Sequence, residues 1–298
     1  MLNANHLKTF LVVLRTGTFA DAGRELGYTA SAVSQQMVAL ERTVGITLFE
    51  RSASAVKPTT AAGSLAAAVQ DVLASINHVE ARAAELARGE RGRLRLSTFS
   101  SAGARLVPQA LQAFLRHRPG VEVVLDEGEP QELIPRLLAG ERDAILVYEY
   151  SSLPHRWPAA VVRHEILVEQ LLLLVPATWE VARDPRVDLR QLEGATFASS
   201  AEGTAGAASL ERLCAAEGYL PRIEFRSNNY DTITGIVASA LATALVPTLG
   251  YRPRPGVVAT ALDVRRASRK VFALHRSENQ GSLIRELLVS LRHAATSL

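Results

Sequence analysis

The spacing of apolar residues changes once along this chain, and that change constrains the fold more than any other feature. Up to residue 88 the apolar residues recur mainly at intervals of three and four, which is the period of an α-helix. After GERGR, residues 89–93, short apolar runs such as RLRLST, VEVVLDEG, RIEFRS and ATALVP alternate with helical patterns, the last over 282–295. Strands interleaved with helices of this length indicate α/β domains with mostly parallel sheets. We therefore expect an all-α N-terminal part followed by an α/β part.

The first 44 residues predict three short helices with clear end signals. An apolar stripe over 7–14 is closed by Gly17, and a second helix over 19–26 ends at Gly27. Thr29 is a plausible N-cap for the third helix. Two helices joined by a short turn containing Gly form the layout of a helix-turn-helix.

In a helix-turn-helix the second helix enters the DNA major groove with its N-terminal residues against base edges. Hydroxyl, amide and methyl groups suited to base contact stand there, on Thr29, Ala30, Ser31, Ser34 and Gln35. The following ITLFERSASAVKPTT indicates a wing, with Arg51 and Lys57 placed for phosphates. The alternative is an ordinary solvated helix face and loop.

Residues 60–88 are rich in alanine and contain no proline, which predicts one long helix of about 40 Å at 1.5 Å per residue. Its apolar residues follow a heptad spacing of four and three, typical of a helix that packs against another along its length. A partner chain is the preferred interpretation, and packing on its own domain is the alternative. The predicted dimer seam is Leu65, Val69, Val72, Ile76, Val79, Ala83 and Leu86.

Composition and motifs argue against catalysis, export and a membrane location. Cys214 is the only cysteine, so an intramolecular disulfide and a cysteine-pair zinc site are excluded, and its helical apolar setting indicates a core residue. The seven histidines are scattered, and no nucleophile elbow, phosphate loop or dinucleotide fingerprint is present, so we expect no catalytic residue, cofactor or metal. Residues 232–251 lack charge but are too polar for a good membrane span, and are expected to form a buried helix and strand. Without a signal peptide, the expected location is cytoplasmic.

With these segments in order, the chain resembles a LysR-type transcriptional regulator over essentially its full length. The resemblance rests on LKTFLVV, GTFADAGRELGYTASAVSQQMVALERTVGITLFER and TAAG, and on LDEGEPQELIPRLLAGERDAIL and VASALATALVP further on. The positions that match the family pattern outright are Ala32, Val33, Ser34, Gln36, Leu40, Glu41, Gly45, Leu48, Phe49 and Arg51.

The resemblance implies a ligand-responsive transcription factor, dimeric or tetrameric, with a winged helix-turn-helix over 1–59 and a linker and dimerisation helix over 60–88. A hinge over 89–92 would precede an effector-binding domain over 93–298 that resembles type 2 periplasmic binding proteins. Lobe I would cover about 93–163 and 266–298, and lobe II about 164–265. Its partner would be double-stranded DNA carrying an interrupted inverted repeat, because a two-fold dimer presents two recognition helices.

The sequence departs from the family pattern at several positions. Ala30 and Ser31 replace the usual Gln and Pro at the start of the recognition helix, which bears on base preference. Gly23 replaces Ala, Ser54 stands where the wing often has Arg, and Ala240 stands where Gly is common, as does Ala242.

A ligand cleft in a two-lobed α/β domain is formed by loops at the carboxyl ends of strands. The candidate effector-binding residues on those loops are mostly short hydrogen-bonding side chains: Thr98, Ser100, Ser101, Tyr148, Ser199, Ser200, Glu202, Thr204 and Asn228. Helix N-termini favour anions, so the expected ligand is a small carboxylate or similar polar metabolite, with Glu202 opposing a strongly anionic group on its side. Ordinary N-capping is the alternative role for the serines.

The alternative function is a solute-binding or small-molecule enzyme domain with an accessory DNA-binding module. An exported solute-binding protein would need a signal peptide, and the helix-turn-helix and seam helix would have no role in it. The regulator is the interpretation that uses every segment.

Overall fold

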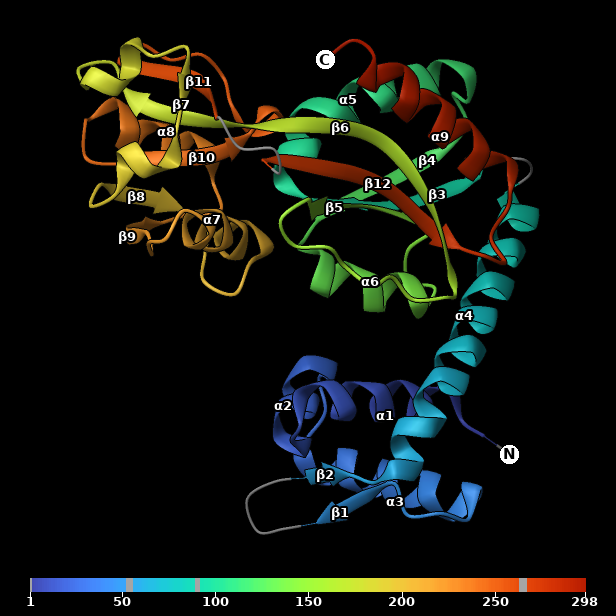
Figure 1. Ribbon diagram of the computed structural model, residues 1–298. Coiled ribbons are helices and arrows are strands. Elements are labelled where there is room, and N and C mark those ends of the chain that lie inside the picture. The colour runs from blue at the N-terminus through green and yellow to red at the C-terminus, as the bar shows by residue number, and fades with distance from the viewer. Residues whose placement is uncertain (1, 52–55, 89–91, 263–266) are drawn as a thin grey trace. The chain divides into compact units, whose positions relative to one another are not determined.

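The computed structural model describes residues 2–51, 56–88, 92–262 and 267–298 (Figure 1). They form two compact units, which are described one after the other. The first covers residues 1–89, and the second covers residues 90–298 except for the turn at 138–141. Most of the expected hinge at 89–92, and Ser54 of the wing, lie outside the described residues.

The first unit is a winged helix-turn-helix continued by a long helix. Its elements are α1 (Ala4–Thr16), α2 (Phe19–Leu26), α3 (Ala30–Val44), β1 (Phe49–Arg51), β2 (Val56–Pro58) and α4 (Thr60–Arg88). The expected end signals are confirmed: Gly17 and Gly27 have φ of +75° and +72° at the ends of α1 and α2. The Thr29 hydroxyl accepts from the Ala32 amide at 3.2 Å and caps α3.

Close packing explains why Gly23 stands within a helix, where glycine costs about 1 kcal/mol relative to alanine. A Cβ at this position would lie 2.6 Å from the Tyr28 carbonyl oxygen, so a side chain would force the turn between α2 and α3 to move. The same turn closes with the Tyr28 amide donating to the Gly23 carbonyl at 2.8 Å. Gly23 therefore permits the close approach of the two helices of the motif.

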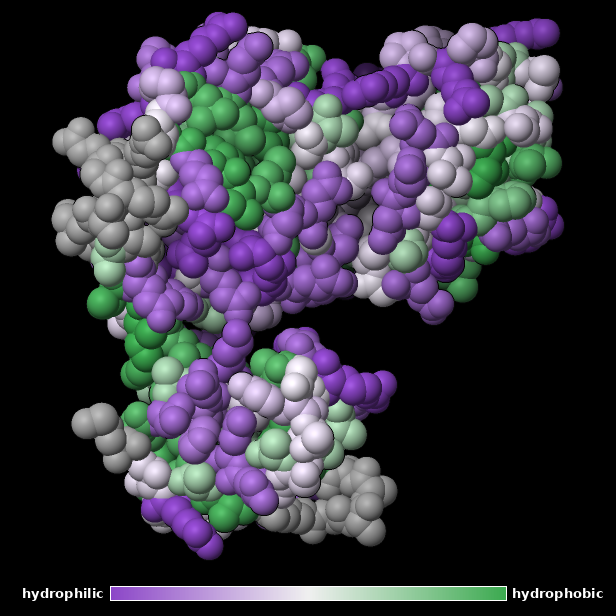
Figure 2. Space-filling view, turned by 180° about the vertical axis from the view of Figure 1, so that it is seen from behind, coloured by the Kyte–Doolittle hydropathy of each residue, from purple (hydrophilic) through white to green (hydrophobic). Residues whose placement is uncertain are grey.

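The first part of α4 packs within its own unit, which corrects part of the seam prediction. Val69 is only 3% exposed and belongs to the core of the winged helix-turn-helix, with Leu65 packed against it. Val72 and Val79 are 42% and 65% exposed. Hydrophobic residues accordingly show on the surface of α4 in Figure 2. Val69 is unavailable to a partner because α4 passes over α1 there, and the side chain of Leu86 lies outside the described residues.

The second unit is α/β, as expected. Its strands are β3 (Arg93–Thr98), β4 (Glu122–Glu127), β5 (Ala144–Tyr150), β6 (Val161–Pro176), β7 (Arg186–Val187), β8 (Thr196–Ser199), β9 (Arg222–Arg226), β10 (Thr243–Pro247), β11 (Val257–Leu262) and β12 (Ser268–Arg276). Its α-helices are α5 (Ser100–His117), α6 (Pro130–Leu138), α7 (Ala205–Ala216), α8 (Tyr230–Ala238) and α9 (Ser282–Ala295), and its 3₁₀ turns are η1 (Glu180–Arg183), η2 (Leu189–Leu192) and η3 (Thr248–Gly250).

The sheets are mixed, whereas the sequence led us to expect mostly parallel ones. The strand order is β4-β3-β5-β12-β6-β10-β8-β9, with β11 beside β6 and β7 beside β11. The pairings of β3 with β4 and β5, and of β8 with β9 and β10, are parallel. However, β12, which the sequence analysis did not foresee, returns between β5 and β6 and runs opposite to both.

The strand β6 belongs to both lobes. Its residues 161–170 pair with β12 in lobe I, and residues 171–176 pair with β10 and β11 in lobe II. The strand thus passes from one sheet to the other after Gln170. The sequence instead predicts the boundary between the lobes near residue 164. A single unbroken strand crosses from one lobe to the other (Figure 1).

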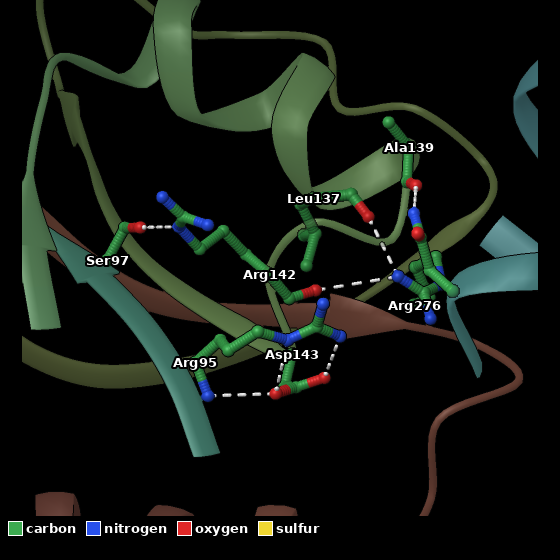
Figure 3. A network of polar contacts seen from close by, with 8 residues as sticks. Arg95, Ser97, Leu137, Ala139, Arg142, Asp143 and Arg276 are labelled. Carbon is green, nitrogen blue, oxygen red and sulfur yellow. Dashed lines mark hydrogen bonds and ion pairs between the residues drawn. The ribbon is translucent and has the colours of Figure 1, made fainter. Parts of the chain in front are cut away.

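A buried arginine closes the end of α6 in lobe I (Figure 3). Arg276 is 7% exposed, and its Nη1 donates to the carbonyls of Leu137 at 3.1 Å and Arg142 at 3.4 Å. Beside it, Arg95 Nη2 binds Asp143 Oδ1 at 2.9 Å. Since the last carbonyls of a helix lack partners within it, the Arg276 guanidinium satisfies that of Leu137 and opposes the negative end of the helix dipole.

Two histidines join β6 to β12. The Nε2 atoms of His164 and His275 are 3.0 Å apart, and Nδ1 of His275 donates to the Arg276 carbonyl at 2.8 Å. His275 Nε2 must then accept from His164 Nε2, which leaves Nδ1 of His164 to face Arg292 at 3.5 Å. Burial, His275 and Arg292 lower the pKa of His164.

None of the described helices has the length and apolar character that crossing a membrane requires. The uncharged segment 232–251 folds as the expected buried helix and strand, α8 followed by β10.

Candidate functional site

The N-terminal half of α3 presents a polar surface in the first unit. Thr29, Ala30, Ser31 and Gln35 are exposed and Ser34 is half-buried, so their side chains are available for contact from outside. The Thr29 and Ser31 hydroxyls lie 3.0 Å apart. This is the surface that a helix-turn-helix turns toward base edges.

The wing is held to α3 by a carboxylate. Oε1 of Glu41 accepts from the backbone amides of Leu48 at 2.7 Å and Phe49 at 3.1 Å, where β1 begins. β1 and β2 pair antiparallel, and Lys57 is exposed on β2 opposite Glu50. The side chain of Arg51 lies outside the described residues, so its predicted phosphate contact remains a prediction.

The second unit contains a pocket between its lobes, called the interlobe pocket from here on. Its lining comes from the ends of β3, β4, β5, β8 and β9, where an open α/β sheet binds ligands, and from β12. The space within this partly open pocket is about 20 Å³, enough for a water molecule, so a larger ligand requires the lobes to part or side chains to turn. The lining residues are Phe99, Ser100, Ser101, Glu129, Tyr148, Tyr150, Ser200, Thr204, Gly206, Asn228, Tyr230 and Arg269.

The structure brings together six of the nine residues that the sequence suggested for a ligand: Ser100, Ser101, Tyr148, Ser200, Thr204 and Asn228. Thr98 and Ser199 do not line the pocket, because each is the last residue of its strand and is buried in the sheet. Glu202 is exposed and also lies outside the lining.

Six lining residues were not foreseen: Phe99, Glu129, Tyr150, Gly206, Tyr230 and Arg269. Glu129 stands directly after GluGly at the end of β4, a position that the same rule about strand ends would have found. Arg269 gave no such signal, because it lies near the start of β12, a strand that the sequence did not reveal.

One residue of the pocket lining, Arg269, belongs to a buried ion pair with Glu169. Arg269 is 1% and Glu169 is 6% exposed, and Arg269 Nε donates to Glu169 Oε1 at 2.7 Å. Arg269 Nη2 donates to the Ser101 hydroxyl at 2.8 Å, and the Leu249 amide donates to Glu169 Oε2 at 2.7 Å. Burial, the largest single influence, disfavours the guanidinium charge, but the Glu169 carboxylate together with Tyr150 and Tyr230 outweighs it and raises the pKa of Arg269. The guanidinium therefore stays protonated.

Aromatic rings enclose this guanidinium. Its Cζ lies 4.9 Å from the Phe99 ring centroid, 5.0 Å from that of Tyr148 and 5.9 Å from that of Tyr150. Such contacts stabilise a desolvated cation. Burial, followed by Tyr150 and Glu129, raises the pKa of the Tyr148 hydroxyl, which remains protonated and donates to Glu129 Oε2.

Three helices begin at the pocket. Ser100 and Ser101 open α5, Thr204 caps α7 by accepting from the Ala207 amide at 3.4 Å, and Tyr230 opens α8. Their dipoles favour negative charge in the space between them, although at α8 the amides of Asp231 and Thr232 already donate to Asn229 Oδ1. Among the described residues, no cluster of three or more histidines, cysteines or carboxylates is placed to hold a metal ion.

Comparison with known proteins covers both units. The helix-turn-helix domain of the lysR family of bacterial regulatory proteins matches residues 4–63, and the LysR substrate binding domain matches residues 87–296. The HTH-type transcriptional regulator IlvR of Caulobacter vibrioides is 29% identical over 249 residues, 83% of this chain and 82% of that protein. The uncharacterized HTH-type regulator YnfL of Escherichia coli shows the same identity and coverage.

Solved structures share the fold. Full-length OxyR of Pseudomonas aeruginosa superposes with a TM-score of 0.64 at 22% identity, covering 98% of this chain and 95% of that one. Full-length CbnR in complex with its target DNA gives 0.58 at 22% identity, covering 98% and 100%. The matching families and relatives are regulators and not enzymes. With a helix-turn-helix match at one end and a ligand-domain match over the rest, the chain belongs to the LysR family of DNA-binding transcriptional regulators.

Proposed function

We propose that this regulator couples a small molecule in the interlobe pocket to the way its winged helix-turn-helix engages DNA. The observation that carries the proposal is that both lobes supply the pocket: Phe99, Tyr148 and Arg269 from lobe I, and Thr204 and Asn228 from lobe II. A ligand held by both would favour one arrangement of the lobes. It shifts the equilibrium only by the difference between its affinities for the two arrangements.

The ligand of this proposal is a small polar metabolite with a carboxylate. The starts of α5 and α7 supply backbone amides, and Ser100 and Ser200 supply hydroxyls. Oδ1 of Asn228 already accepts from the Ala201 amide at 2.9 Å, so its amide nitrogen is turned to act as a donor. Donors for an anion thus come from both lobes.

Bulk placed in the pocket tests this role. We expect Ser100→Trp and Thr204→Trp to bind DNA normally and to abolish the inducer response of a reporter gene. The matched control is Glu202→Trp, which adds the same ring to the same loop outside the lining and should respond as wild type. The operator comes from genome-wide mapping of binding sites, and candidate inducers come from the metabolites of the neighbouring genes. A normal response in both pocket variants would place the effector elsewhere.

For DNA, the proposal assigns base contact to Thr29, Ala30, Ser31, Ser34 and Gln35. Gln35→Ala and Ser34→Ala should each weaken cognate DNA by about 1–3 kcal/mol and random DNA less, because base contacts specify sequence. Binding is measured by fluorescence anisotropy on both DNAs. Equal losses on both for Gln35→Ala would remove it from the reading set.

The wing lysine and arginine have a different expected signature. Arg51→Ala and Lys57→Ala should weaken cognate and random DNA alike, and each should make the salt dependence shallower by about one phosphate contact. A salt slope equal to that of wild type would exclude a phosphate contact for the residue concerned.

The assembly that fits these parts is a homodimer, or a tetramer built from two of them, acting on chromosomal DNA in the cytoplasm. The apolar face of α4, on which Val72, Val79 and Ala83 are exposed and Ile76 is half-buried, supplies the surface for a second copy. Two recognition helices related by a two-fold axis then select an interrupted inverted repeat.

A further inference from the structure

We propose that the effector carries a protonated amino group as well as a carboxylate, and that the Glu129 carboxylate binds the amino group. This inference rests on the proposed function, since it takes the interlobe pocket to be the effector site. It narrows the ligand from polar acids in general to zwitterions of the amino-acid type.

Glu129 occupies a position where a helix normally receives a cap. It directly precedes α6, whose first residue is Pro130, and its carbonyl accepts from the amides of Glu132 and Leu133. Ser, Thr, Asp or Asn is preferred at such a position because a short side chain can cap the helix. The Glu129 carboxylate instead lines the pocket and accepts from the Tyr148 hydroxyl. A residue that departs from the local preference and faces a cavity points to a role in binding.

The carboxylate of Glu129 has no matching positive charge in the described part of the chain. Its side-chain partner is the neutral Tyr148 hydroxyl, and the nearest lining cation, Arg269, is engaged by Glu169 and Ser101. An anionic ligand could use Arg269 only by competing with Glu169, a carboxylate already in place at 2.7 Å. The guanidinium therefore adds little net attraction for a simple acid, and Glu129 repels one.

The surroundings strengthen an interaction with Glu129. Phe99, Tyr148 and Tyr150 wall the pocket near it, with the Tyr148 and Tyr150 rings 5.5 Å apart edge to face. Such walls exclude water and lower the local dielectric, so attraction between opposite charges grows. The starts of α7 and α8 face the same space from lobe II and favour the opposite end of the ligand. A zwitterion satisfies both ends, whereas a plain acid satisfies one.

The experiment compares matched ligands on the full-length protein. Each probe set consists of an L-amino acid, the 2-hydroxy acid that replaces its amine by a hydroxyl, and its amide, which removes the carboxylate charge. Sets with the side chains of alanine, leucine, phenylalanine, aspartate and arginine cover different sizes and charges. Thermal shift identifies binders, and titration calorimetry gives affinities for wild type, Glu129→Gln and the control Glu127→Gln.

Glu127 is a suitable control because it lies two residues before Glu129, at the end of β4, is exposed, and does not line the pocket. Glu129→Gln keeps the shape and an oxygen that can accept from Tyr148, so folding should be preserved, which tryptophan fluorescence checks. We expect at least one amino acid to bind better than both of its analogues. Glu129→Gln should weaken that amino acid roughly 10- to 100-fold, as expected for loss of a charged hydrogen bond, and should leave the 2-hydroxy acid unchanged or tighter.

A 2-hydroxy acid that binds as well as its amino acid, or an amino acid whose affinity is the same in Glu129→Gln as in Glu127→Gln, would overturn the inference. Failure of every amino acid in the sets to bind would also overturn the inference. These outcomes leave the proposed function standing if a plain acid or another metabolite binds and Thr204→Trp abolishes that binding. The proposed function fails separately if a ligand binds outside the pocket.

Discussion

Removing the negative partner of the buried pair between Glu169 and Arg269 should destabilise the effector domain strongly. With side chains 5% and 1% exposed, neither charge has access to water that could replace the other. Glu169→Gln keeps the volume and an oxygen for the Leu249 amide, so it isolates the loss of charge. Breaking such a pair costs about 3–5 kcal/mol, which for a domain of this size corresponds to a fall of roughly 6–20 °C in Tm.

The assay can be confined to this domain without truncating the chain. Both tryptophans, Trp157 and Trp179, lie in the second unit, so intrinsic fluorescence reports the unfolding of that unit alone. The companion variant Arg269→Met removes the cation, and in that background Glu169→Gln should cost less than about 1 kcal/mol because no charge is left stranded. If Glu169→Gln alone costs less than 1 kcal/mol, or if the two changes simply add, the pair is not the desolvated interaction described above.

Three other perturbations follow from single features. Ala240 has φ of +59° and is exposed, so Ala240→Gly should stabilise the domain by about 0.5–1 kcal/mol in thermal unfolding, and destabilisation would contradict the strain. The lowered pKa of His164 means that the folded state binds a proton less readily than the unfolded state. The contribution of His164 to the free energy of unfolding is therefore complete above pH 6.5 and is lost as pH falls through the folded pKa. Wild type should thus lose more Tm than His164→Gln between pH 8 and pH 5, and equal losses would exclude the histidine. Val72→Asp with Ile76→Asp should dissociate the proposed dimer in sedimentation, since a charge in an apolar seam is desolvated without a partner, and an unchanged oligomer would show that α4 is not the interface.

The N-terminal unit was predictable almost residue by residue, because its boundaries depend on local chemistry. Thr18 and Thr29 cap helices through their own hydroxyls, and Gly17 and Gly27 end them with positive φ. Each of these signals acts within about four residues. The clash that makes Gly23 necessary was not predictable, since it depends on how closely the Tyr28 carbonyl approaches.

The α/β unit was predictable in class but not in topology. The strands β3, β4 and β10 stood out as apolar runs, whereas the apolar run of β12, residues 271–274, is short and is flanked by Arg269, Lys270, His275 and Arg276. Its charged residues are tolerated because each has a partner elsewhere in the chain, such as Glu165, whose Oε2 accepts from Lys270 Nζ at 3.1 Å. Partners about 100 residues apart in sequence leave no local pattern.

The same distinction explains the pocket. Strand ends can be read from sequence, and they located Ser100, Thr204 and Asn228, but the charge state of the pocket depends on a contact between residues 100 positions apart. Without Glu169 beside it, Arg269 would suggest an anion site. Because Glu169 neutralises Arg269, the unmatched charge of the pocket lining is the carboxylate of Glu129.

The position of the buried pair also connects stability to signalling. Glu169 lies just before β6 leaves the sheet of lobe I for that of lobe II, and it holds the Leu249 amide of η3. Arg269 opposite it holds Ser101 at the start of α5, and Arg105 of the same helix donates to the Thr248 carbonyl at 3.0 Å. The pair thus sits where the lobes join and contacts the pocket on one side. In the proposed function, a ligand that shifts Ser101 or Tyr148 would act on the residues that fix how the two lobes meet, which gives pocket occupancy a short route to a change in the arrangement of the lobes.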